Sequence, residues 1–492
     1  MPVFLRGGAA SIEVLRAGHV QSIESGFITY RVRLGMGRRC LLSILSVDWR
    51  SAGVGQRPSI RHARSRSYSA AWRRLAITAI VLYRFQASPI SCKKADLVGR
   101  LEPVLQRSVS IALGGALATA IAFGPARVGF GLFLSQFRDA FALSSSMAGF
   151  IASSAFASFF ASLLIAGALT PRFGPRMPVV LGLMAAVIGM VTVVLADQVL
   201  WLAVGVALAA TSAGLCWSPF NTAAERGVPA ELRGRALSIV STGTTGGIVL
   251  AGVLALALAS MAYNWRVAWV AFAGCALVAG AYNLWVLGLV LRAPGDDSGP
   301  GLMHSATRLV HRRAWPLYGV AVSFGVTSGV YLSFVAGYVE SSGGLPGLSA
   351  GLSSPVLYIA IGIGGLVGLA TAEFEARIGL VWLMRAIFTA SMLSLLAAAY
   401  VPASWLGLGV SGALQGACIM MQSSIFAFWS DRLFPDLASV SLTVVLMFYA
   451  AGNVIGPALA GTAADAWSMQ LVFVVSAGVS LATALLFPSR AG

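Results

Sequence analysis

Two long apolar runs, residues 177–196 and 199–221, decide the fold class of this chain. The first reads MPVVLGLMAAVIGMVTVVLA and the second VLWLAVGVALAATSAGLCWSPFN, and only Asp197 and Gln198 separate them. A helix needs about 20 apolar residues to cross the hydrocarbon core of a bilayer. Each run is therefore long enough to span a membrane, and the short break predicts a tight connection between consecutive spans.

The same alternation of apolar run and short polar break continues on both sides, from about residue 108 to the end of the chain. It predicts twelve membrane-spanning helices at residues 108–134, 146–169, 177–196, 199–221, 236–260, 266–291, 315–339, 351–372, 379–399, 404–430, 438–462 and 468–488. The longest interior break carries PGDDSGPG. The pattern thus predicts an all-α membrane protein with a six-helix bundle over 108–292, a central loop over 293–314 and a second six-helix bundle over 315–492.

Composition excludes the main alternatives to a membrane protein. Of the 492 residues, 58% are hydrophobic and only 10% are charged, against about 25% charged in an ordinary soluble protein. A water-soluble fold would have too little charged surface to cover that much apolar side chain. The five cysteines show no paired or metal-ligand spacing.

The first fifth of the chain differs from the rest. Residues 1–107 hold 18 Lys and Arg against 5 Asp and Glu, whereas residues 108–492 hold 16 Arg, no Lys and 12 acids. The stretch Arg57–Arg74 has no motif of a nucleic-acid-binding module. We therefore expect residues 1–107 to be a basic, disordered extension that binds no nucleic acid.

Arginine placement predicts the orientation of the helices, because cytoplasmic loops are enriched in Lys and Arg. If the N-terminus is cytoplasmic, only Arg138 and Arg266 fall in outer loops. Twelve arginines then fall inside: Arg172, Arg176, Arg226, Arg233, Arg235, Arg292, Arg308, Arg312, Arg313, Arg377, Arg432 and Arg490. We expect the protein to lie in the inner membrane of a bacterium, with both termini on the cytoplasmic side.

The two predicted bundles repeat each other in sequence. Five features recur at offsets of 202 to 206 residues: Trp201 and Trp405, Arg172-Phe-Gly174 and Arg377-Ile-Gly379, Pro229 and Pro435, Gly246 and Gly452, and Trp265 and Trp467. Such a series indicates duplication. Repeat-built bundles are a common transporter architecture, with the substrate site between the repeats.

One loop resembles a known family motif. Gly167-Ala-Leu-Thr-Pro-Arg172-Phe-Gly174-Pro-Arg176 is similar to G-x-L-x-D-R-x-G-R-R of the major facilitator superfamily, and the resemblance extends over residues 108–492. Ala122–Gly131 resembles the first helix of its YbfB-like bacterial branch. The resemblance implies that Gly167, Arg172, Gly174 and Arg176 form the conformational loop. Proline at 171 replaces the motif aspartate, so the charge relay that latches the two halves in that superfamily lacks its carboxylate here.

Arg127 is the most informative single residue, because a charge within a spanning helix costs several kcal/mol and marks a functional-site hypothesis. The neighbouring Gly124, Gly129 and Gly131 would allow close approach of a helix or a ligand. A guanidinium there could bind a carboxylate with two parallel hydrogen bonds. Alternatively, the side chain could extend to the outer interface.

Other candidates follow from polar residues inside apolar helices. Near the predicted midplane we select four further substrate-binding candidates: Gln415, Tyr449, Tyr331 and Thr327. Near the inner face, Arg385 could pair with Glu373 or Glu375 and form an inner latch, or it could extend to the interface.

Together these features predict a twelve-helix secondary transporter of a small organic anion that works by alternating access. The alternatives are a multidrug or hydrophobic-compound exporter and, from another class, a membrane sensor that does not transport. No catalytic constellation, metal site or phosphate-binding loop stands out, so we expect no enzymatic activity and no cofactor. We expect a monomer in the lipid bilayer that binds a small-molecule substrate, with a proton as the candidate coupling ion.

The arginine count makes a direct prediction about topology. Reporter proteins fused in the loop after Arg292 and at the C-terminus should both give cytoplasmic signals, because an even number of spans separates each point from the other. Alkaline phosphatase and fluorescent-protein fusions at the two points measure this. A periplasmic signal at either point would contradict the twelve-helix topology.

Overall fold

The computed structural model describes residues 92–289 and 314–486, together with five strands between residues 4 and 48. The chain divides into two compact units, Met1–Ala95 and Asp96–Gly492. The predicted central loop, 293–314, lies outside the described residues except for its last position.

The first unit contains an antiparallel sheet. Its strands are β1 (Phe4–Gly7), β2 (Ala10–Glu13), β3 (Ile23–Glu24), β4 (Phe27–Met36) and β5 (Arg39–Asp48). Strand β4 pairs with β2, β3 and β5, and its register with β5 runs from Phe27 opposite Asp48 to Met36 opposite Arg39. The alternation of apolar residues in β4 is the strand signal that composition alone does not reveal.

The second unit is built from long helices. Their bounds are α2 (Cys92–Phe123), α3 (Pro125–Leu132), α4 (Leu134–Phe141), α5 (Ser145–Phe173), α6 (Arg176–Leu195), α7 (Val199–Gly227), α8 (Ala230–Ser260), α9 (Trp265–Val286), α11 (Trp315–Ser341), α12 (Ser353–Gly365), α13 (Thr371–Ile378), α14 (Leu380–Tyr400), α15 (Trp405–Leu433), α16 (Ala438–Ala466) and α17 (Met469–Leu486), with short 3-10 helices at Leu287–Leu289, Leu366–Ala370 and Pro435–Leu437. Eleven spans within the described residues are long and apolar enough to cross a membrane. The remaining long helix is α15, which contains Gln415 and Gln422.

These helices confirm the predicted all-α, two-bundle membrane architecture. The first span, Leu105–Leu132, lies close to the predicted 108–134, although helix α2 itself begins at Cys92. The span consists of the end of α2 followed by α3, because Pro125 has no N–H to continue the hydrogen-bond series of α2. The eighth span similarly consists of α12, a 3-10 turn and α13.

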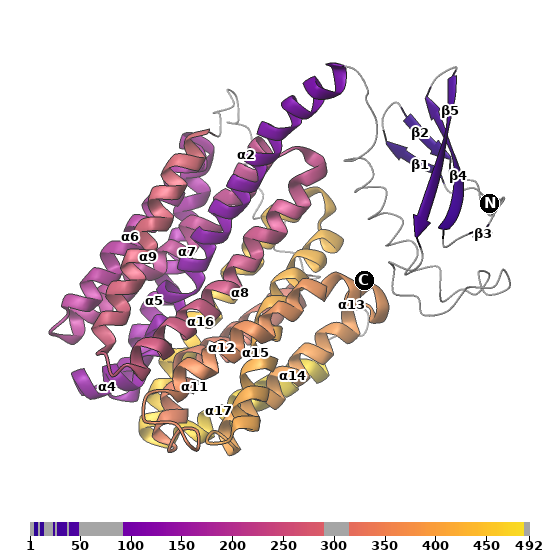
Figure 1. Ribbon diagram of the computed structural model, residues 1–492. Coiled ribbons are helices and arrows are strands. Elements are labelled where there is room, and N and C mark those ends of the chain that lie inside the picture. The colour runs from indigo at the N-terminus through magenta and orange to yellow at the C-terminus, as the bar shows by residue number, and fades with distance from the viewer. Residues whose placement is uncertain are drawn as a thin grey trace. The chain divides into compact units, whose positions relative to one another are not determined.

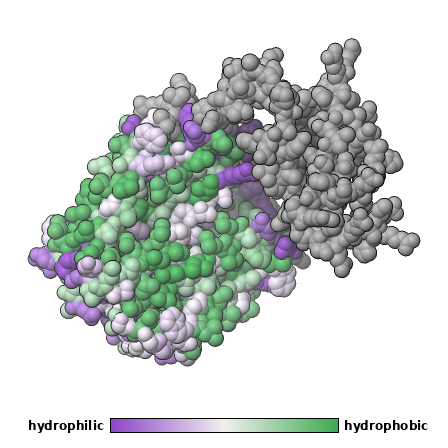
Figure 2. Space-filling view, in the orientation of Figure 1, coloured by the Kyte–Doolittle hydropathy of each residue, from purple (hydrophilic) through white to green (hydrophobic). Residues whose placement is uncertain are grey.

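The helices form two halves, α2–α9 and α11–α17, which stand side by side in Figure 1. Contacts of α5 with α16 and of α8 with α12 join the halves. Hydrophobic side chains cover the visible flank of this unit, as Figure 2 shows, and hydrophilic ones gather toward its ends. This distribution suits a protein whose flank faces lipid.

The two ends of the helical unit differ in charge. Helices α5, α7, α13 and α15 all finish at one end, and each carries an arginine in its last turn: Arg172, Arg226, Arg377 and Arg432. We call this the arginine-rich end. Helix α5 begins and helix α16 finishes at the other end, which we call the opposite end.

Close contact between backbones depends on glycines at particular positions. A Cβ at Gly247 of α8 would lie 2.1 Å from the carbonyl oxygen of Ala120, and one at Gly124 would lie 2.4 Å from that of Gly247. A Cβ at the adjacent Gly246 would have no other atom within 4 Å. Gly247 therefore allows α8 to pack directly against α2, whereas Gly246 does not contribute to that contact.

This pair of glycines gives a matched test of the packing. Gly247→Val should lower the stability of the folded protein by about 1–3 kcal/mol, because the side chain forces the α2 and α8 backbones apart. Gly246→Val should have a much smaller effect. Thermal unfolding of the purified proteins in detergent, followed by size-exclusion chromatography, measures both. Equal losses from the two substitutions would contradict the packing described here.

Candidate functional site

A cavity lies between the two halves and encloses about 940 Å³, counting the space at its open side. Both halves line it. The N-terminal half supplies Phe123, Arg127, Phe159, Trp217, Ser241, Thr242, Thr244 and Thr245, and the C-terminal half supplies Phe324, Gly365, Gly368, Leu369, Ile419, Met420, Gln422, Ser423, Ser424, Phe426, Leu446 and Tyr449.

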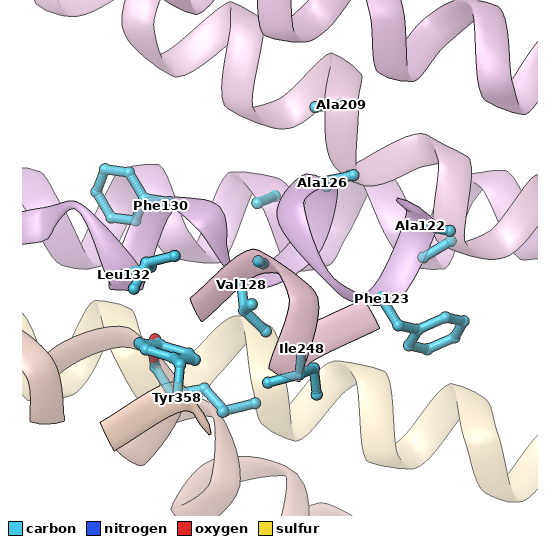
Figure 3. Packing of buried hydrophobic residues seen from close by; sticks show 14 of the residues in the cluster. Ala122, Phe123, Ala126, Val128, Phe130, Leu132, Ala209, Ile248 and Tyr358 are labelled. Carbon is cyan, nitrogen blue, oxygen red and sulfur yellow. The ribbon is translucent and has the colours of Figure 1, made fainter. Parts of the chain in front are cut away.

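The cavity lies toward the arginine-rich end. On α8 its lining begins at Ser241, in the part of the helix nearer that end, and on α15 it continues to Phe426, two turns before Leu433. At the opposite end the halves touch instead. A Cβ at Gly131 of α3 would lie 2.3 Å from the Tyr358 hydroxyl of α12, and Figure 3 shows this tyrosine among the buried residues around α3. The structure is thus closed at one end and hollow toward the other.

Arg127 lies in the wall of this cavity rather than at the outer interface. Its guanidinium carbon is 4.7 Å from the ring centre of Phe159, 5.3 Å from that of Phe123 and 5.5 Å from that of Phe156. Aromatic faces attract cations at such distances. Phe123 is the last residue of α2 and Arg127 lies in the first turn of α3, so this contact spans the break between the two helices.

The charge of Arg127 is not neutralised by a neighbouring acid. Its Nε is enclosed without a hydrogen-bond partner, and no ion pair to Arg127 is found within residues 92–289 and 314–486. Among the lining residues it carries the only formal charge, since the other polar ones are hydroxyls and the amide of Gln422. The cavity therefore presents positive potential surrounded by apolar and aromatic walls.

Arg127 also borders a second, smaller space of about 380 Å³. Its other lining residues include Phe130 and Gly131 of α3, farther along the chain toward the opposite end, and Leu332 and Ser333 of α11. The guanidinium thus lies between the main cavity and this second pocket, which residues of both halves also line.

Tyr449 is the second sequence candidate that lines the cavity. Its ring stacks on Phe324, with centres 6.1 Å apart, and tilts against Phe426 at the same separation. Its hydroxyl accepts a long hydrogen bond of 3.5 Å from Ser328 Oγ. With Trp217, whose ring is 5.8 Å from Phe123, these rings give the cavity aromatic walls on both halves.

The other three midplane candidates, Gln415, Tyr331 and Thr327, do not line the cavity. They are fully buried inside the C-terminal half. The Gln415 side-chain oxygen accepts from Ser391 Oγ at 3.2 Å, the Tyr331 hydroxyl lies 2.8 Å from Ser411 Oγ, and Thr327 donates to the carbonyl of Ser323. The first two contacts join α11, α14 and α15 within one half, and the third lies within α11. The faces that carry them point away from the space between the halves.

Two prominent lining residues, Trp217 and Gln422, are not among the candidates selected from sequence. Gln422 is 1% exposed, and neither its amide nitrogen nor its oxygen has a partner among the described residues. An amide within an apolar helix is a detectable signal, whereas a tryptophan there is indistinguishable from lipid-facing or core aromatic residues until the helix is placed.

No group of three or more histidine, cysteine, aspartate or glutamate side chains in the described parts of the chain could hold a metal ion.

Comparison with known proteins identifies the family. Residues 111–379 match the sequence model of the Major Facilitator Superfamily. The chain belongs to this superfamily. Membership indicates a multi-pass membrane transporter of small molecules rather than an enzyme. No curated protein sequence matches the chain.

Solved superfamily structures share the fold. The nucleoside transporter NupG superposes with a TM-score of 0.64 at 13% identity, over 77% of this chain and 98% of that one. A bacterial homologue of the human lysosomal transporter Spinster, in an inward-facing and unoccupied conformation, gives 0.57 at 18% identity, over 77% and 95%. A POT family transporter in complex with a thioalcohol-conjugated peptide gives 0.64 at 12% identity, over 77% and 95%. At these identities the likeness shows the fold alone.

The superfamily loop motif lies between α5 and α6 at the arginine-rich end. Gly174 ends α5 with φ +76°, a conformation that favours glycine, and Gly379 ends α13 with φ +78°. These are the two glycines that recur 205 residues apart in the sequence. A Cβ at Gly167 would meet no atom within 4 Å, whereas one at Gly288 would lie 3.6 Å from the Arg176 guanidinium, so Arg176 packs beside the end of α9.

Arg385 does not pair with either of the two glutamates expected to form an inner latch with it. Glu375 forms an ion pair with Arg432, at the end of α15, and not with Arg385. Arg385 instead lies over the exposed ring of Trp382, 5.1 Å from its centre, and Glu373 is exposed. The reason is geometric: α13 and α15 finish at the same end, which brings their last turns together. Both partners belong to the C-terminal half, so this pair does not connect the halves.

Proposed function

We propose that this transporter carries a small organic anion, bound in the cavity between the halves with its anionic group on Arg127. The observation that carries the proposal is the unpaired guanidinium in an apolar cavity. A cation in such surroundings interacts strongly with an opposite charge, because little water screens it. Arginine offers a planar set of donors that matches a carboxylate.

The aromatic walls support a substrate with an apolar body. Phe123, Phe159 and Trp217 on one half face a cavity that Phe324 and Tyr449 border on the other. A flat or hydrophobic group can pack between such rings. The same walls support the alternative, an exporter of hydrophobic compounds, which would differ from the first proposal in accepting neutral molecules equally well.

The transport mechanism in this proposal is alternating access. The two halves rock about the bound substrate, and the cavity opens first at one end and then at the other. With the arginine-rich end in the cytoplasm of a bacterium, the described state faces inward. The cavity wall holds no carboxylate that could carry a proton alongside the substrate. A proton nevertheless remains the candidate coupling ion.

Substitution of Arg127 tests this proposal. Purified protein should be stabilised against heat by a subset of organic monocarboxylates and not by their neutral methyl esters. Arg127→Lys should weaken that binding by about 1–3 kcal/mol, roughly 5- to 150-fold in Kd, because lysine cannot donate the paired hydrogen bonds. Arg127→Ala should weaken it further. Thermal-shift titrations and uptake into liposomes measure binding and transport.

Arg385→Lys provides the matched control, since Arg385 is also an arginine of a spanning helix that lies over an aromatic ring, but outside the cavity. It should leave binding and uptake unchanged. Equal stabilisation by acids and their esters would favour the hydrophobic-compound exporter. Ligand binding without uptake into liposomes would favour the sensor.

A further inference from the structure

A single carboxylate bridges the two halves at the opposite end. Asp465, in the last turn of α16, accepts hydrogen bonds from the backbone N–H of Ser145 at 2.9 Å and of Ser146 at 2.8 Å, and from Ser146 Oγ at 2.5 Å. Helix α5 begins at Ser145, and α5 and α16 belong to different halves. This contact therefore joins the halves through one side chain.

The contact satisfies groups that α5 cannot satisfy by itself. The first N–H groups of a helix have no partner within it, and their aligned dipoles attract an anion. Ser144 Oγ accepts a hydrogen bond from the N–H of Met147 at 3.1 Å. The carboxylate of Asp465 accepts from the two preceding N–H groups, those of Ser145 and Ser146. When the halves separate at this end, the N–H groups of Ser145 and Ser146 must exchange the carboxylate for water.

Arg138 strengthens the same contact from the N-terminal half. It lies in α4, and its guanidinium donates to Ser145 Oγ at 2.8 Å. Its positive charge attracts the Asp465 carboxylate. The carboxylate thus faces a helix N-terminus and a cation, both of which belong to the other half.

The polar contact lies at the end of a tight packing seam between α5 and α16. A Cβ at Gly149 would be 2.3 Å from the carbonyl oxygen of Pro457, and one at Gly461 would be 2.3 Å from that of Ser145. Such close backbone packing has one well-defined separation of the helices. The backbone packing of the seam and the hydrogen bonds of the Asp465 carboxylate therefore form together and break together.

We propose that Asp465 is the gate residue of this transporter, which closes the opposite end by binding the N-terminus of α5. It acts through α5 rather than on the substrate, so it sets the balance between the two conformations without contacting the substrate. This role rests on the alternating access proposed above, but it does not depend on the identity of the substrate.

Two reporter cysteines distinguish gating from a loss of stability. Ser333→Cys places a thiol at a buried position beside the second pocket, in the part of α11 nearer the opposite end, and Ser241→Cys places one in the main cavity, at an exposed position. We expect the thiol at 333 to become accessible when the opposite end opens. Each is introduced into the full-length purified protein in nanodiscs. The rate of reaction with a charged maleimide is measured, and the rate of the chain without the reporter is subtracted as background.

Asp465→Asn removes the charge and keeps the size of the side chain. It should raise the labelling rate at Ser333→Cys about two- to fivefold, the range expected for a solvent-exposed charge at a helix terminus, and it should not raise the rate at Ser241→Cys. Asp139 is an exposed aspartate of α4 that makes no hydrogen bond to the described parts of the chain, and Asp139→Asn should change neither rate.

Two results would overturn the gate. Unchanged labelling at Ser333→Cys in Asp465→Asn would show that the carboxylate does not hold the opposite end closed. A rise at both reporters would show general loosening of the fold. Because labelling needs no substrate, failure of the anion proposal would leave this result intact, and failure of the gate would leave the Arg127 titrations intact.

Discussion

The halves of this transporter touch closely at the opposite end, and the rest of the site depends on that contact. Gly149, Gly461 and Gly131 let backbones from the two halves approach to distances that no larger residue would allow. Two rigid bundles that meet at one end must separate toward the other. The cavity at the arginine-rich end, with the aromatic residues in its wall, follows from this geometry.

Within that cavity, Arg127 carries a charge whose burial is costly in an apolar environment. Three phenylalanine faces offset part of the cost, and an anionic substrate would offset more. The same residue borders the second pocket on its other side. In the proposed mechanism, a binding group in this place is exposed to one end at a time, which is the requirement for coupling binding to a change of conformation.

The polar contacts divide into those that stabilise one half and those that join the two. Tyr331 with Ser411, and Glu375 with Arg432, lie within the C-terminal half and keep it rigid as it moves. The contact of Asp465 with Ser145 and Ser146 joins the halves. The bonds of the second class must break during transport, which favours an exposed carboxylate that water can replace at low cost.

The sequence by itself determined the spans, the arginine asymmetry, the duplication and the family, because a bilayer imposes length, hydropathy and loop charge on any chain that crosses it. It also singled out Arg127, since a charge in an apolar helix is an anomaly that needs no structure to detect. Only the tertiary structure decided that Tyr449 lines the cavity while Gln415, Tyr331 and Thr327 do not. These helices are apolar on all sides, so periodicity does not reveal which face meets which neighbour. The partners of Glu375 and Asp465 were undetermined for a related reason: Ser145 and Asp465 lie 320 residues apart, and only the packing of the two halves brings them together.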